Sequence, residues 1–141
     1  MLISQILNPR ILGKYSLILI KDDKIIYCSH LSGIRPLIYC IEKYYSCLKD
    51  CILYDKVVGL AAAKLIVYSQ MITTVITSVV SKNAQSLLQK NKIHLEAQKI
   101  VSHILQPDKH LICPLEIQAL NIDDHTLFFQ KIKKSLKKQK L

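Results

Sequence analysis

Two β-prone runs joined by a pair of aspartates constrain the fold of this chain more than any other feature. Residues 15–21 and 24–29 are rich in Ile, Leu and Tyr, and Asp22-Asp23 stands between them. Short runs of this composition, separated by two turn-forming residues, are typical of adjacent antiparallel strands. The pattern therefore predicts a β-hairpin near the start of the chain.

Helical and strand-like segments alternate after this hairpin. We expect helices over 36–45, 56–70 and 82–91, and strands over 51–54, 73–80 and within 93–101. Asp55 and Ser81 are the N-caps that we expect for the second and third of these helices. With a short helix over residues 2–12, this order predicts an α/β protein, with three α/β/α layers around a mixed central sheet of about five strands.

The last part of the sequence predicts two further helices. Cys113-Pro114 suits a helix start, and Glu116 follows Cys113 at a capping-box-like spacing. From residue 126 onward, Phe128, Ile132 and Leu136 form one apolar stripe surrounded by lysines. We therefore divide the chain into a domain over residues 1–125 and a basic amphipathic helical tail over residues 126–141.

The positive charge is concentrated in that tail. The net charge is +10, and six of the lysines lie in residues 131–141, which leaves +4 on residues 1–130. A basic tail can gather nucleic acid without sequence specificity. A solvated helix that aids solubility explains the same lysines, and we favour it because runs of like charge are usually solvated.

The sequence also indicates a compartment. The longest apolar stretch, residues 57–68, is interrupted by Lys64 and is shorter than a membrane span. Because no signal peptide is apparent, we expect a cytoplasmic protein that does not bind a membrane. The sequence is compatible with an oligomer. The five cysteines are then expected to be reduced thiols.

Three short motifs carry a resemblance to a known family. They are Gly-Ile-Arg-Pro-Leu at 33–37, Asp-Lys-Val-Val-Gly at 55–59 followed by three alanines at 61–63, and Cys-Pro-Leu-Glu at 113–116. Over residues 15–125 the chain resembles a small bacterial family, domain-of-unknown-function family eighteen-ninety-three, whose fold is cytidine-deaminase-like. The resemblance implies a lysine at position 60 and a methionine at position 115, where this chain has Leu60 and Leu115. Position 60 therefore lacks the charge that would favour phosphate binding there.

The resemblance implies a fold whose enzymes hold a catalytic zinc ion, and this chain lacks the ligands. Zinc deaminases use a His-x-Glu segment at one helix start and Pro-Cys-x-x-Cys at the next. The corresponding segments here, 32–35 and 55–58, contain neither histidine nor cysteine. A separate site from Cys28, His30, Cys47 and Cys51 lacks the common zinc spacing. We therefore expect no metal, no cofactor and no zinc-dependent deaminase activity.

Polar residues at two predicted helix starts are the candidate ligand-binding residues. Arg35 lies at the first start, where free N–H groups and an arginine together favour an anion. Asp55 and Lys56 lie at the second, and Gly59 in a helix suggests close approach by backbone or ligand. The resemblance implies that both starts line one pocket. Alternatively, Arg35 pairs with a surface carboxylate, Asp55 is a plain N-cap and Lys56 is a surface lysine.

Three functions follow from these observations. The leading hypothesis is a zinc-free protein that binds a small anionic ligand such as a nucleotide. The second is an enzyme of another chemistry, in which Asp55 and Lys56 react, or in which Cys113 at a helix start is a nucleophile with His110 as its base. A buried cap cysteine is the alternative for Cys113. The third is an interaction module whose C-terminal lysines recruit RNA.

Overall fold

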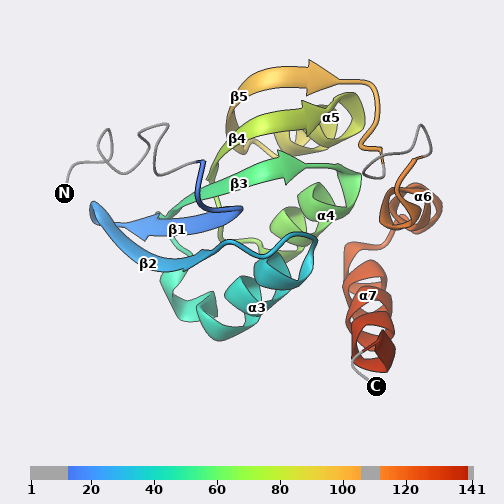
Figure 1. The fold of residues 1–141 in the computed structure, drawn as a ribbon, viewed down its shortest axis with the longest axis horizontal. Coiled ribbons are helices and arrows are strands. Elements are labelled where there is room, and N and C mark those ends of the chain that lie inside the picture. Colours follow the sequence, from blue (N-terminus) through green and yellow to red (C-terminus); the bar gives the residue numbers. More distant parts are fainter. Residues whose placement is uncertain (1–12, 106–111, 140–141) are drawn as a thin grey trace.

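The structure alternates strands and helices after an opening hairpin (Figure 1). This computed structural model describes residues 13–105 and 112–139, with the backbone alone for residues 137–139. The elements are β1 (Leu17–Lys21), β2 (Lys24–Ser29), α3 (Arg35–Lys43), the 3-10 turn η1 (Tyr45–Cys47), β3 (Ile52–Val58), α4 (Leu60–Ser69), β4 (Thr74–Ser81), α5 (Lys82–Lys90), β5 (His94–Val101), α6 (Pro114–Asn121) and α7 (His125–Gln139).

The predicted hairpin is confirmed. β1 pairs antiparallel with β2, with Leu17 opposite Ser29. Asp22 and Asp23 have φ angles of 52° and 64°. Two left-handed residues in succession form the tight turn whose twist matches that of the flanking strands, and Asp is among the residues that tolerate this conformation.

The hairpin joins a five-stranded mixed sheet, as predicted. The strand order is β2-β1-β3-β4-β5, in which β1 runs antiparallel to β3 while β3, β4 and β5 are mutually parallel. The carboxyl ends of these three strands therefore share one edge of the sheet. That edge faces the starts of α4 and α5, because each of these helices directly follows a parallel strand.

The boundary between β3 and α4 differs from the prediction. β3 continues through Val58, and α4 begins at Leu60 with Gly59 as its N-cap. Asp55 is therefore a strand residue and caps no helix. Val57 and Val58 are β-branched residues that pair with β4, and this pairing outweighs the local capping signal of Asp55.

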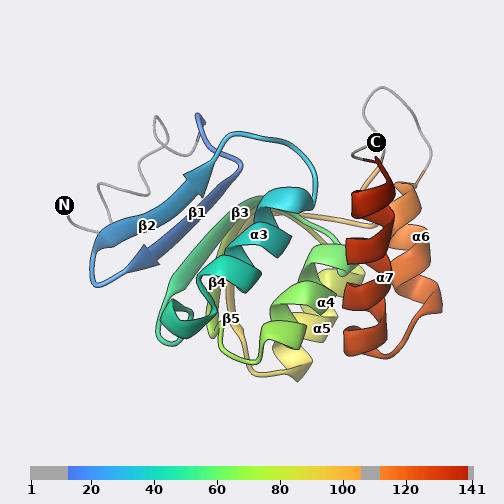
Figure 2. The same ribbon diagram turned by 90° about the horizontal axis from the view of Figure 1, so that it is seen from below.

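The described helices cover one face of the sheet (Figure 2). α3, α4 and α5 pack against Leu17, Leu53 and Val75 in one hydrophobic core, and α6 and α7 pack on the outer side of α4. On the opposite face, the residues Ile18, Ile20 and Tyr54 form a separate small cluster. The described part of the chain thus has the order sheet, helices, helices, which differs from the predicted α/β/α layers.

The helices after β3 follow the sequence closely. Ser81 accepts a hydrogen bond from the Ala84 N–H at 3.3 Å, which confirms the predicted cap of α5. Phe128 and Ile132 of the predicted apolar stripe are buried, and Leu136 packs against the same core. The helix expected over residues 2–12 and the turn expected at 106–108 lie outside the described residues. None of the helices in the described ranges has the length and apolar character of a bilayer-crossing segment.

Candidate functional site

The predicted site residues are distributed over three different environments. Arg35 is the first residue of α3, Asp55 and Lys56 lie within β3, and Gly59 is the N-cap of α4. Successive strand residues point to opposite faces of a sheet, so Asp55 and Lys56 cannot act as an adjacent pair. Lys56 is exposed. These four residues therefore do not line one pocket together, and only Arg35 among them lines the groove described below.

The start of α4 is occupied by a carboxylate of the chain itself. The N–H groups of Leu60 and Ala61 donate to the two oxygens of Glu116, at 2.6 Å and 3.0 Å. Glu116 comes from α6 and is only 9% exposed. The first N–H groups of a helix lack partners within the helix and attract negative charge. Glu116 thus fills the position that an anionic ligand would take, and it does not form the predicted capping box with Cys113.

Gly59 makes this contact possible. A Cβ at position 59 would lie 2.3 Å from Oε1 of Glu116, which is far inside van der Waals contact. The sequence predicted close approach by backbone or ligand at Gly59, whereas the approaching group is the Glu116 carboxylate of the chain itself. A free anion cannot occupy the same place while Glu116 is bound there.

A buried lysine completes the junction between α4 and α6. Lys64 is 6% exposed, and its Nζ donates to the carbonyl oxygens of Ala119 and Ile122 at the end of α6. Burial lowers the pKa of Lys64, and the nearby Asp123 opposes this effect. Glu116 therefore caps the start of α4, while Lys64 caps the end of α6. Both charges have the sign that the helix dipoles favour.

Asp55 is recessed in the middle of β3. Its side chain is densely surrounded by protein atoms but keeps partial contact with solvent. Burial raises the pKa of the Asp55 carboxyl to about 8, although a hydrogen bond from the Val57 N–H opposes the shift. Burial likewise raises the pKa of Cys40, on α3, to about 12, with smaller effects from Cys51 and Asp55. Asp55 is therefore largely protonated at neutral pH.

Arg35 lies at an open groove between β2, α3 and α7. Its Nη2 donates to the Leu136 carbonyl oxygen at 3.3 Å, so the predicted surface carboxylate is replaced by the backbone of α7. The groove has a volume of about 400 Å³. Its lining is mostly apolar and combines aromatic and cationic side chains: Tyr27, Leu31, Arg35, Pro36, Ile38, Tyr39, Glu42, Lys133 and Leu136.

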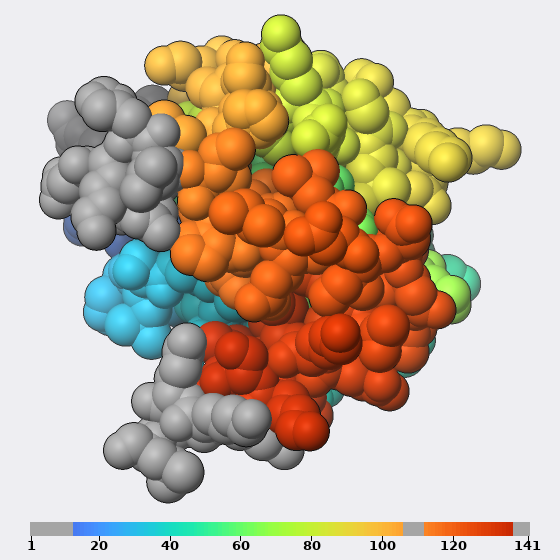
Figure 3. Space-filling model, turned by 90° about the vertical axis from the view of Figure 1, so that its right-hand side faces the viewer, coloured from blue at the N-terminus to red at the C-terminus, as the bar shows by residue number. Residues whose placement is uncertain are grey.

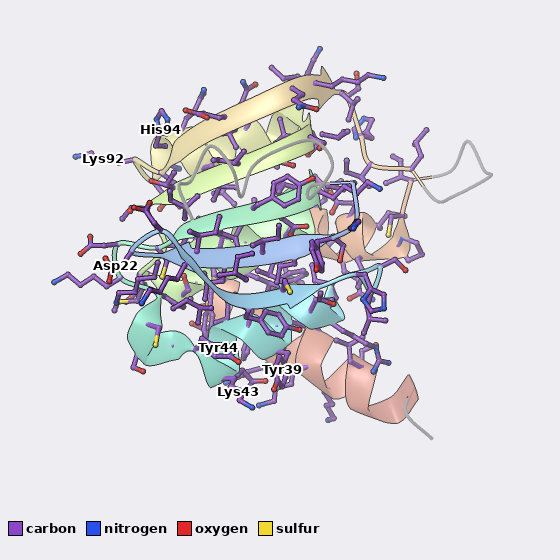
Figure 4. All side chains as sticks on the ribbon, turned by 60° about the vertical axis from the view of Figure 1, so that its left-hand side comes forward. Asp22, Tyr39, Lys43, Tyr44, Lys92 and His94 are labelled. Atoms are coloured by element: carbon purple, nitrogen blue, oxygen red, sulfur yellow. The ribbon has the colours of Figure 1, made fainter. Side chains whose placement is uncertain are left out.

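Tyrosine rings form one wall of this groove. Tyr39 is 44% exposed, and its ring centroid lies 5.4 Å from that of Tyr27. The Lys43 Nζ lies 5.4 Å from the centroid of the Tyr39 ring. A hydrogen bond that Lys43 donates to the Tyr39 side chain raises the pKa of Lys43, together with the charges of Tyr39 and Tyr44. Figure 4 shows Tyr39, Lys43 and Tyr44 gathered on α3. The site thus places a half-exposed tyrosine side chain beside positive charge.

The opposite wall comes from the far end of the sequence. Lys133 of α7 forms an ion pair with Glu42 of α3, 91 residues away in the chain. Figure 3 shows the residues at the start of α3, in cyan, beside the red end of α7. Sequence reasoning found Arg35 but missed Tyr27, Tyr39 and Lys133, because only the packing of α7 brings these residues together.

Cys113 is the N-cap of α6, in line with its predicted place at a helix start, and it is partly exposed. His110, its proposed base, lies outside the described residues. Among the described residues, no side chain is hydrogen-bonded to the Cys113 thiol, and no group of three or more His, Cys, Asp or Glu side chains is placed to hold a metal ion. All five cysteines are free thiols.

A larger hollow of about 980 Å³ lies at the opposite edge of the sheet, where α3, α4 and α5 end. Asp123, Asp124 and Lys92 line it, together with His125, whose Nδ1 is buried without a hydrogen-bond partner in the described residues. Burial and the charge of Lys64 lower the pKa of His125. None of the predicted site residues reaches this hollow.

The fold and these sites define a small mixed α/β protein with a five-stranded mixed sheet and one open aromatic groove. Residues 6–136 match the family described as "Domain of unknown function (DUF1893)". Because this match covers most of the sequence, the chain belongs to the DUF1893 family. This finding confirms the family resemblance of the sequence motifs.

A solved structure supports the fold. A crystal structure of a DUF1893 family protein from Thermotoga maritima superposes with a TM-score of 0.81 at 23% sequence identity. The similarity covers 89% of this chain and 85% of that chain. No curated protein is detectably similar in sequence. At this identity the likeness establishes the shared fold alone.

Proposed function

We propose that this protein binds a small planar anion, such as a nucleotide, in the groove between β2, α3 and α7. The observation that carries this proposal is the meeting of a half-exposed tyrosine with two cationic side chains in one groove. Tyr39 supplies the ring, while Arg35 and Lys133 line the same groove. A volume of about 400 Å³ lies within the usual range for small-molecule sites.

The groove offers different contacts to the base and to the phosphate of a nucleotide. The base would pack against Tyr39, which is 44% exposed, and Leu31 and Pro36 supply further apolar contact. A guanidinium has five N–H donors, so Arg35 retains donors for a phosphate beside its bond to the Leu136 carbonyl. Arginine suits this role because its planar donor group matches phosphate oxygens.

We further propose a cytidine-deaminase-like layout from which the catalytic metal has been lost. The starts of α3 and α4, where that layout would hold zinc, carry Arg35, Gly59 and Leu60. Glu116 fills the second start. We place the protein in the cytoplasm, because five free thiols suit a reducing compartment.

Isothermal titration with a nucleoside monophosphate tests the binding proposal. The wild-type chain should bind, and Tyr39→Ala should weaken the affinity about tenfold, in line with the usual loss per stacked base. Tyr45→Ala is the matched control, since Tyr45 is 50% exposed and lies outside the groove. Absence of binding at millimolar nucleotide, or an equal loss in both variants, would refute the proposal.

A further inference from the structure

The two edges of the sheet differ in how well they can receive another strand. At one edge, the pairing of β2 with β1 contains a register shift between Leu19 and Ile20. Bulges of this kind bend an edge strand and disturb further pairing. At the other edge, β5 pairs with β4 in one constant register from His94 to Val101. β5 is therefore the regular edge of the sheet.

The outer side of β5 has no partner within residues 13–105 and 112–139. In this part of the chain β5 pairs with β4 alone, and Figure 1 shows it at the outer limit of the sheet. Six of its eight residues are exposed, and the strand contains neither proline nor glycine. An edge of this kind presents a row of N–H and C=O groups that serve as a template for pairing with another chain.

A second copy of the same strand fits this edge. In an antiparallel pair with two-fold symmetry, one residue lies opposite itself and its neighbours lie opposite each other. A centre at Glu96 would oppose two carboxylates, and a centre at Lys99 would oppose two ammonium groups, and both contacts are destabilising. Centres at Ala97 and Gln98 avoid both contacts and give the longest overlap of the two strands.

The side chains favour the centre at Ala97. That centre places Glu96 opposite Gln98 of the second copy, and the symmetry makes this contact twice. The glutamine amide has two N–H donors, which the carboxylate accepts. Glu96 and Gln98 line a small hollow with Tyr54 on the sheet face opposite the helices, so they point to the same side, as residues two apart in a strand do. A centre at Gln98 would instead place the carboxylate against Ile100.

We propose that this chain forms a two-fold dimer, in which β5 pairs antiparallel with β5 of a second copy around Ala97. The pairing joins two five-stranded sheets into one continuous sheet. It also keeps the helices of both copies on the same face of that sheet. No residue of the groove between β2, α3 and α7 takes part, so the dimer is independent of the proposed function.

Sedimentation velocity over a range of protein concentrations tests the dimer, with charge introduced at residue 98. Gln98→Lys sets an ammonium group opposite Glu96 twice in each dimer, so it should lower the dissociation constant of the dimer about fivefold. Gln98→Glu sets two carboxylates together at the same places and should raise this constant by a similar factor. The net charge of +10 predicts the opposite signs, because an added lysine increases the repulsion between copies.

Gln130→Lys and Gln130→Glu are the matched controls. Gln130 is exposed on α7, away from β5, and these variants make the same changes in net charge. Their small effects should follow the net charge, with lysine weakening the dimer. The double variant Glu96→Lys/Gln98→Glu places opposite charges together again, so it should recover the association that Gln98→Glu loses.

Hydrogen exchange supplies an independent measurement. The backbone amides of β5 should gain protection as the protein concentration rises, because pairing closes the outer edge of the strand.

A wild-type chain that stays monomeric up to millimolar concentration would overturn the inference. So would a dimer that responds to residues 98 and 130 alike, or one whose added protection lies outside β5. None of these results affects nucleotide binding in the groove, which the titration of Tyr39→Ala tests separately.

Discussion

The starts of α3 and α4 carry similar sequence signals but have different surroundings. At α4, the N–H groups of Leu60 and Ala61 are bound by Glu116 and shielded from solvent. At α3, Arg35 lies beside an open groove and contacts the Leu136 carbonyl. One helix start is satisfied from within the chain, and the other adjoins surface that can receive a ligand.

The different burial of the two helices explains this contrast. α4 is apolar around its whole circumference and is enclosed by α3, α5, α6 and α7, so its polar ends need partners from inside the protein. α3 buries Leu37, Cys40 and Ile41 on one side and exposes Tyr39 on the other. The contrast teaches that a helix start stays open to a ligand only where the neighbouring elements leave it uncovered.

Closing the space at Gly59 should produce the largest effect. Gly59→Ala places a methyl group 2.3 Å from Oε1 of Glu116, so the carboxylate must move away from the start of α4. We expect a loss of about 3 kcal/mol in the free energy of unfolding, from overpacking and two broken hydrogen bonds. Urea denaturation measures it.

Gly33→Ala is the control for this substitution. Gly33 has a φ of 90° but no atom within 4 Å of a built Cβ, so only backbone strain is expected, at about 1 kcal/mol. If Gly59→Ala costs no more than Gly33→Ala, the tight junction between α4 and α6 is refuted.

Removing the charge of Lys64 tests the other end of the same junction. Lys64→Met keeps much of the side-chain volume but leaves the Ala119 and Ile122 carbonyls without this donor. We expect a loss of roughly 2 kcal/mol. Lys90→Met, at an exposed position in α5, should change the stability by less than about 0.5 kcal/mol. Equal effects of the two variants would contradict the role of Lys64.

Asp55 should make the stability depend on pH. Its folded pKa of about 8 lies above the ordinary value near 3.8, so the native state binds more protons between these limits. Its contribution to stability is therefore fully present below pH 4 and is lost as the pH rises toward 8. Asp55→Asn should abolish this fall, which denaturation at pH 5 and pH 8 measures. An unchanged pH profile would show that Asp55 ionises normally.

The smallest effect on stability is expected in the open region. Tyr39 is a half-exposed surface residue, so Tyr39→Ala should change the free energy of unfolding by less than about 1 kcal/mol. Thermal unfolding beside Tyr45→Ala measures this change. A loss as large as that of Gly59→Ala would mean that the groove serves packing rather than binding.

The sequence predicted local features well and long-range ones poorly. The Asp22-Asp23 turn, the Ser81 cap and the stripe of Phe128 and Ile132 depend on nearby residues, and all three are confirmed. The start of α4 was misplaced by four residues, because pairing of Val57 and Val58 with β4 outweighed the local signal of Asp55.

The groups that lie at the starts of α3 and α4 are set by long-range contacts, which no local sequence pattern encodes. Glu116 reaches Leu60 across 56 residues, and Lys133 reaches Glu42 across 91. The sequence signals for the buried junction were Gly59 and the single charge of Lys64 within an apolar run. The contacts of Glu116 with Leu60 and of Lys133 with Glu42 could not be predicted without knowing how α6 and α7 pack.

An NMR titration of the ¹⁵N-labelled chain with adenosine monophosphate tests the central claim most directly. The account predicts chemical-shift changes at Arg35 and Tyr39, with the amides of Leu60 and Ala61 unmoved because Glu116 holds them. Shifts centred on Leu60 and Ala61, with Arg35 and Tyr39 unchanged, would contradict it.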